Sequence, residues 1–376
     1  MLNKVLVPLD GSPLATCVIP HLVAITQATD AQITLLRVTE MNDPSGRINP
    51  VEWHLSKVEA QTYLDEIAEQ LEQFTGHKPE TQVLQGPAAE RIIEYAQKHE
   101  QDLIVLSTHG QSGLNGWNVS SVAMKVINRA GLSILLVPAY LPDTSSQEGN
   151  WGVIHYQHIL APLDGSQRAE CVLPIAASLA QQYQADLLLA HVVVRPEMIQ
   201  RMPLTNEDAT LADQVVERNQ IQATKYFEQL QNRLSPAPRT RVLVGEHVTS
   251  ELHKLLEQEK VDLVLVSAHG NSGQNQWPYG SVVTSFITYS AVPLLILQDL
   301  PLYEIQPTEA ERATAVKQNV WRKSNGHNGN YGEREQTGHV SDQNGQTLQS
   351  VFTNIKKNYG IRKTTKVNAY AYTALL

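Results

Sequence analysis

The chain contains the same sequence module twice, and this duplication limits the folds open to it. The segment Lys4–Ser12 returns as His158–Ser166, and both end in Pro-Leu-Asp-Gly-Ser. A second shared segment, Thr108–Gly113, returns as Ala268–Gly273 with the common pattern His-Gly-x-Ser-Gly. Because the shared segments keep their order over a domain-sized length, the pattern indicates duplicated domains rather than the short repeats of a solenoid.

The length of 376 residues leaves room for two domains of ordinary size and a further segment. We expect the first domain over residues 1–139, a polar linker over 140–152 and the second domain over 153–299. Residues 300–376 have the composition of a disordered tail. From Val351 onward this tail is basic, with no acidic residue. It could touch nucleic acid or an anionic surface, although we favour a solvated tail.

Composition restricts the compartment and the partners. The net charge of -9 argues against nucleic-acid binding by the folded part. The chain has no uninterrupted apolar stretch of membrane-spanning length, and it begins directly with a strand pattern, so we expect a cytoplasmic protein. The two cysteines, Cys17 and Cys171, stand at equivalent positions. We interpret them as free thiols in helix cores, with a redox pair across the domain interface left open.

Short apolar runs alternate with amphipathic segments in both copies. The predicted helices of the first copy include Val58–Phe74 and Ala88–His99, each with an apolar stripe at helical spacing. Runs rich in Val, Ile and Leu are typical of strands buried on both faces. This alternation predicts an α/β fold, with two five-stranded, doubly wound, Rossmann-like parallel-sheet domains in tandem. The strands expected in the first copy are Lys4–Leu9, Gln32–Val38, Thr81–Leu84, Leu103–Ser107 and Ser133–Val137.

Ligands of doubly wound sheets bind outside the carboxyl ends of the strands, near the point where the strand order reverses. In the first copy, Asp10 ends the first strand, Val38 ends the second and Ser107–Gly110 follows the fourth. We expect these residues to converge on one crevice in each copy. Their counterparts in the second copy are Asp164, Val192 and Ser267–Gly270.

The residue types at this crevice fit a nucleotide. A loop of small residues brings backbone N–H groups close to a phosphate. Ser121 and Ser281 stand before apolar helical patterns, where serine is a good N-cap and the helix start suits an anion. An aspartate at the first strand end can accept hydrogen bonds from a ribose. Each feature alone also fits a simple turn or cap, but their joint occurrence in both copies favours a nucleotide site.

In these motifs the sequence resembles the universal stress protein family, in its tandem form, from Lys4 to about Leu297. ATP-binding members of that family carry the pattern Gly-x2-Gly-x9-Gly-Ser/Thr. The second copy differs from it only at the first glycine, and the first copy differs at two positions. The corresponding residues are Ser267, Gly270, Gly280 and Ser281 in the second copy, and Ser107, Gly110, Ser120 and Ser121 in the first.

The resemblance implies a role for each part of the crevice. Asp10 or Asp164 would meet the ribose or adenine, and the backbone of Val38 or Val192 would meet adenine. The loop with Ser121 or Ser281 would hold the phosphates of ATP. The resemblance also implies pairing of the last strands within one chain, Ser133–Val137 with Pro293–Leu297. Further association into a homo-oligomer stays open.

Ser120 distinguishes the two copies. If the site requires a left-handed backbone there, a side chain costs about 1–2 kcal/mol. Since about 1.4 kcal/mol is tenfold in affinity, we expect weaker nucleotide binding in the first copy, and the second copy is the preferred site.

Three functions remain open. The favoured one is a stress-response protein in which bound ATP is a regulatory or stabilising ligand. The alternatives are a slow ATPase or nucleotidyl-transfer enzyme, and a structural pseudo-dimer without nucleotide. His109 and His269 are candidate general bases, but no nucleophile elbow or Walker motif accompanies them. We therefore interpret both as loop-structuring residues. The sequence has no metal-ligand cluster, so magnesium would arrive with the nucleotide.

Overall fold

The computed structural model describes residues 2–40, 50–110, 119–139, 154–196, 206–270 and 278–299. The predicted linker and the predicted tail lie outside the described residues. So do residues 111–118 and 271–277, which contain the end of the repeated His-Gly-x-Ser-Gly sequence in each copy.

The first copy alternates strands and helices as predicted. Helix α3 is longer than expected and begins at Pro50 rather than Val58, because its first turns continue past the apolar stripe that the sequence shows. The elements are β1 (Lys4–Pro8), α1 (Pro13–Thr16), α2 (Ile19–Thr29), β2 (Gln32–Thr39), α3 (Pro50–Thr75), β3 (Glu80–Gln85), α4 (Ala88–Lys98), β4 (Leu103–Ser107), α5 (Ser121–Arg129) and β5 (Ser133–Val137).

The second copy repeats this order, element by element. Its elements are β6 (His158–Pro162), α6 (Gln167–Glu170), α7 (Leu173–Tyr183), β7 (Asp186–Val194), α8 (Asn206–Arg233), β8 (Arg239–Gly245), α9 (Val248–Gln258), β9 (Leu263–Ser267), α10 (Ser281–Tyr289) and β10 (Leu294–Leu297).

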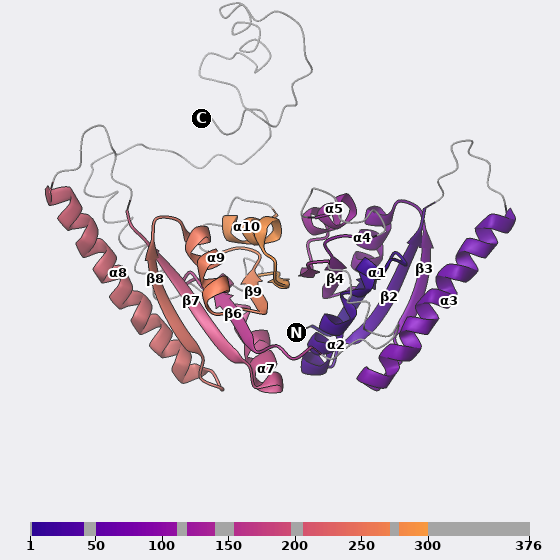
Figure 1. Cartoon of the computed structure of the whole chain (residues 1–376), viewed down its shortest axis with the longest axis horizontal. Helices are drawn as coiled ribbons and strands as arrows, with labels where there is room; N and C mark the ends of the chain where they lie inside the picture. The colour runs from indigo at the N-terminus through magenta and orange to yellow at the C-terminus, as the bar shows by residue number, and fades with distance from the viewer. Residues whose placement is uncertain are drawn as a thin grey trace, which may run out of the picture. The chain divides into compact units, whose positions relative to one another are not determined.

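All ten strands belong to one sheet, in the order β3-β2-β1-β4-β5-β10-β9-β6-β7-β8 (Figure 1). Within each copy the strands run parallel, and the order reverses between the first and fourth strands. The predicted α/β fold with two doubly wound parallel sheets is therefore confirmed. The expected pairing of the last strands is confirmed as well, since β10 pairs antiparallel with β5.

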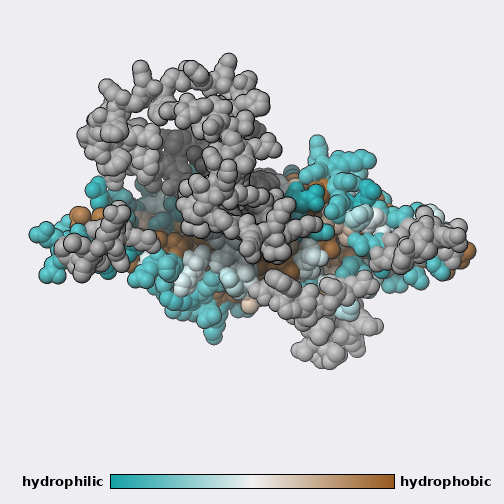
Figure 2. All heavy atoms as spheres, turned by 90° about the horizontal axis from the view of Figure 1, so that it is seen from above, coloured by the Kyte–Doolittle hydropathy of each residue, from teal (hydrophilic) through white to brown (hydrophobic). Residues whose placement is uncertain are grey.

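Helices cover both faces of the sheet, because the strands carry apolar side chains on both sides. One core packs α2, α3, α7 and α8 against the sheet, and the other packs α4, α5, α9 and α10. Each core contains residues of both copies. In Figure 2, hydrophilic residues dominate the visible described surface, with apolar residues in smaller areas between them. Among the described helices, none combines the length and apolarity needed to cross a membrane.

Polar contacts reinforce the junction between the copies. The Tyr183 hydroxyl donates to the carbonyl of Ala24 at 2.8 Å. The Tyr279 hydroxyl donates to the carbonyl of Ile127 at 2.9 Å, on the other face of the sheet. These hydrogen bonds satisfy buried or half-buried phenols, which would otherwise be costly to remove from water.

The central pairing makes a prediction about stability. Leu135 is fully buried in β5 and lies opposite Leu295 of β10. Leu135→Ala should lower the free energy of unfolding by about 2–5 kcal/mol, because it leaves a cavity in the shared core. Urea unfolding measures this loss. Leu55→Ala is the matched control, because Leu55 is exposed on α3, and its effect should stay within about 0.5 kcal/mol. Equal effects of the two changes would contradict the packing described.

His21 makes a second prediction, about pH. Burial lowers the pKa of His21 to about 4, and its Nδ1 lies 2.9 Å from the hydroxyl of Tyr156. The folded state keeps this imidazole neutral while the unfolded chain protonates it below about pH 6.5. Stability should therefore fall as the pH drops from about 6.5 to about 4, by on the order of 3 kcal/mol from this group.

His21→Gln should flatten the slope of unfolding free energy against pH in that window. The control is His54→Gln, which changes an exposed histidine of α3 and should leave the slope as it is. A His21→Gln slope equal to that of the unmodified chain would contradict the assignment.

Candidate functional site

A pocket of about 590 Å³ opens at the carboxyl ends of β1, β2 and β4, where the strand order reverses. The structure therefore brings together all the site residues predicted for the first copy. The predicted residues that line it are Asp10, Val38, Ser107, Gly110, Ser120 and Ser121.

The second copy has a smaller pocket, of about 110 Å³, at the equivalent place. It too is lined by every residue predicted for that copy. These residues are Asp164, Val192, Ser267, Gly270, Gly280 and Ser281.

The turn after the first strand holds the pocket aspartate in place. One carboxylate oxygen of Asp10 accepts hydrogen bonds from the Ser12 backbone N–H at 2.9 Å and from its hydroxyl at 2.6 Å. The Ser12 hydroxyl in turn caps α1 by accepting from the Ala15 N–H. Gly11 makes this turn possible, because its φ of 84° is one that side chains disfavour. Asp164 and Ser166 repeat these contacts in the second copy.

The other carboxylate oxygen of Asp10 reaches the loop that follows β4. A Cβ on Gly110 would lie only 2.1 Å from Oδ2 of Asp10. The same separation holds between Gly270 and Asp164. Only glycine leaves room for this approach, so the aspartate and the glycine fix the ends of the first and fourth strands against each other. Both residues line the pocket of their copy.

The helix that borders each pocket begins one residue earlier than predicted, so its N-cap also lies one residue earlier. Ser121 and Ser281 are the first helical residues, and the N-caps are Ser120 and Gly280. The prediction that Ser121 and Ser281 cap these helices is therefore wrong. Ser120 has the extended backbone that a cap requires, and its hydroxyl accepts from the Ala123 N–H at 3.2 Å.

The proposed strain at Ser120 is absent. Its φ is -65°, and the φ of Gly280 is -69°. Neither backbone is left-handed, so a side chain costs nothing there. The preference for the second copy consequently loses its physical basis. Serine is also a better cap than glycine by a few tenths of a kcal/mol.

Sequence reasoning missed Arg37, which lines the pocket of the first copy. Its guanidinium lies over the ring of Tyr63, 5.0 Å from the centroid, and beside Gly11. The equivalent residue in the second copy is His191, whose Nδ1 donates to the carbonyl of Leu163 at 2.8 Å. A signal was available, because Arg37 is the one charged residue in the apolar strand β2.

The loop histidines have different partners in the two copies. His109 Nδ1 lies 3.1 Å from the hydroxyl of Thr108. His269 Nδ1 lies 2.6 Å from a carboxylate oxygen of Asp299, which also forms an ion pair with Arg168. Both histidines are buried. These contacts agree with the interpretation of loop-structuring residues, and Asp299 is a partner that the sequence did not reveal.

The cysteine thiols and the candidate metal ligands lie apart from one another within the described residues. Neither Cys17 nor Cys171 forms a disulfide. Burial raises the pKa of Cys171 to about 11, so this thiol stays protonated and unreactive near neutral pH. In the described ranges, no three His, Cys, Asp or Glu side chains gather as metal ligands.

Both copies of the module match one family of known proteins. The model of the universal stress protein family matches residues 1–138 and 155–298. Universal stress protein MJ0531 of Methanocaldococcus jannaschii is 32% identical over 139 residues, which are 36% of this chain and 81% of that protein. Universal stress protein Rv2005c of Mycobacterium tuberculosis is 22% identical over 201 residues, covering 53% of this chain and 62% of that protein.

A solved structure shares the fold over both copies. The crystal structure of a universal stress protein from Archaeoglobus fulgidus covers 79% of this chain and 99% of its own, with a TM-score of 0.52 and 18% identity. At this identity the similarity concerns the fold alone.

Gly270 and Gly280, the two motif glycines of the second copy, should respond differently to the same substitution. Gly270→Ser places a Cβ against Asp164 and should lower the free energy of unfolding by about 1–3 kcal/mol. In Gly280→Ser the new Cβ lies 3.8 Å from the Ala268 carbonyl oxygen, and the change should be only about a few tenths of a kcal/mol. Denaturant unfolding compares the two, and similar losses would contradict the close aspartate–glycine approach.

Proposed function

Since the chain belongs to the universal stress protein family, we propose that it binds an adenine nucleotide at the carboxyl ends of its strands. The nucleotide acts as a regulatory or stabilising ligand in a stress response. The observation that carries this proposal is the repeated frame, in which an aspartate, a loop glycine and a helix start line one pocket in each copy.

The pocket of the first copy supplies the groups that a nucleotide needs. The Asp10 carboxylate is held in a fixed orientation and can accept hydrogen bonds from ribose hydroxyls. The start of α5 offers N–H groups and the positive end of a helix dipole to phosphates. Arg37 adds a permanent positive charge to the same pocket, which favours an anionic ligand.

The first copy is the stronger candidate on this basis. Its volume of about 590 Å³ lies within the common range of small-molecule sites, whereas the 110 Å³ of the second pocket lies below that range. The second copy also has His191 in place of Arg37. We therefore propose that nucleotide binds first, and more tightly, to the first copy, with any magnesium carried by its phosphates.

Nucleotide titration of the full chain tests this proposal. Asp10→Ala and Arg37→Ala should each weaken ATP binding by about tenfold or more, since a hydrogen bond or contact to a charged group contributes about 1.5–3 kcal/mol. The matched changes Asp164→Ala and His191→Ala should leave the tighter binding event unchanged. Calorimetry with ATP and ADP reads out both affinity and stoichiometry.

Two results would overturn the proposal. One is the absence of nucleotide binding to the unmodified chain, both in titration and as co-purified nucleotide identified by mass spectrometry. The other is a loss of the tighter event in the Asp164→Ala chain but not in the Asp10→Ala chain, which would assign the site to the second copy.

A further inference from the structure

The first turns of α3 extend beyond the part of the helix that covers the core. The helix begins at Pro50, and residues 51–59 are all exposed, whereas burial starts at Ala60. From there Leu64 and Leu71 pack into the core. In Figure 1, α3 runs along the side of the first copy that carries the edge strand β3. Residues 51–59 supply no buried side chain, so core packing does not explain their composition.

Apolar side chains are concentrated in these exposed turns. The described residues include ten large apolar side chains that are exposed, and four of them lie between Val51 and Val58. Val51, Leu55 and Val58 retain 65%, 54% and 49% of their exposure, and their spacing of four and three residues places them in one row. Because the buried Leu64 lies two and a half turns after Leu55, this row faces away from the core. Adjacent exposed apolar side chains of this kind are typical of interaction sites.

Acidic residues border this apolar row and continue it. Glu59 follows Leu55 by four residues and therefore stands beside the row. Farther along the same side, Thr62 follows Val58 by four residues and Glu66 follows Thr62 by four. Glu59 and Glu66 are both exposed. The whole helix carries six acidic residues against one lysine, so the potential around the apolar row is negative and favours a positively charged partner.

The corresponding helix of the second copy does not repeat this surface. On α8, Leu211 and Val215 are also exposed and four residues apart, but Arg218 occupies the third place of that row. A second arginine, Arg195, forms an ion pair with Asp213 of α8 at 2.7 Å. The combination of an apolar row with acidic neighbours is therefore a property of the first copy and not a requirement of the fold.

We propose that the outer face of α3, defined by Val51, Leu55, Val58, Glu59 and Glu66, binds a basic amphipathic helix of another protein. A row of apolar residues at helical spacing packs against the apolar side of a second helix. Lysine or arginine beside that apolar side meets Glu59 and Glu66. A second copy of this chain brings like charges together at this face, and anionic lipids and nucleic acids are repelled for the same reason. The face therefore selects a basic protein segment.

Fluorescence anisotropy of the full chain with a labelled leucine–lysine peptide in amphipathic order tests the proposal. The peptide has about 18 residues, which is long enough to form a helix, and comparison peptides replace lysine by glutamate or leucine by serine. Only the leucine–lysine peptide should bind, at one site per chain, and added salt should weaken its binding. Leu55→Ser should weaken binding by about tenfold or more. The double change Glu59→Lys and Glu66→Lys should also weaken it and remove most of the salt dependence.

Ile221→Ser and Glu228→Lys are the matched controls, because they make the same kinds of change at exposed positions of α8. Each should leave the peptide affinity unchanged, and all variants should keep the circular dichroism of the unmodified chain. The proposal is overturned if the leucine–lysine peptide does not bind, if the glutamate peptide binds as tightly, or if the Leu55→Ser chain binds as the unmodified chain does. Sedimentation that shows dimers of the unmodified chain but monomers of the Leu55→Ser chain would also overturn it, because the face would then serve a second copy.

Discussion

The antiparallel pairing of β5 with β10 is the contact on which the rest of the structure depends. Each copy alone would present its last strand as an open sheet edge, with unpaired N–H and C=O groups. Pairing of Ile134–Leu136 with Leu294–Ile296 removes both edges and produces one ten-stranded sheet. The two apolar cores then extend over both copies. The duplication therefore supplies within one chain the partner that each copy needs.

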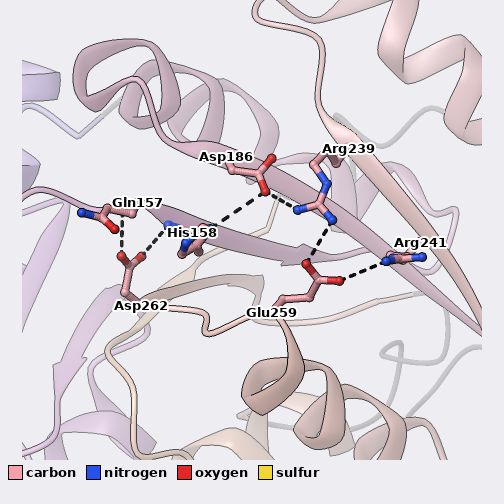
Figure 3. A network of polar contacts seen from close by, with 7 residues as sticks. All are labelled: Gln157, His158, Asp186, Arg239, Arg241, Glu259 and Asp262. Carbon is pink, nitrogen blue, oxygen red and sulfur yellow. Dashed lines mark hydrogen bonds and ion pairs between the residues drawn. The ribbon is translucent and has the colours of Figure 1, made fainter.

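The two copies keep the same order of elements but differ in the residues at both ends of their strands. At the carboxyl ends, Asp10 and Asp164 make the same contacts with a following serine and a loop glycine. The differences lie in neighbouring residues, such as Arg37 against His191. At the amino ends of the strands, an ion pair links β8 to the end of α9 in the second copy (Figure 3). The first copy has a pocket with a polar lining at the same place. Half-exposed ion pairs of this kind contribute little to stability.

Much of the fold was predictable because buried parallel strands are short apolar runs that stand out between polar turns. All five strands predicted in the first copy agree with the structure to within one residue at each end, and β4 and β5 agree at both ends. The site residues were predictable for a related reason, since the topology places every strand end at one edge. The error at the helix cap arose because two adjacent serines, Ser120 and Ser121, cannot be ranked without their backbone angles.

The sequence by itself determined the duplicated α/β architecture and six of the residues that line each carboxyl-end pocket. These depend on periodicity and local spacing, which are readable along the chain. The tertiary structure alone decided the negative φ at Ser120, the position of Arg37 beside Gly11 and the contact of His269 with Asp299. Each of these depends on residues or angles that are fixed only when distant segments pack together.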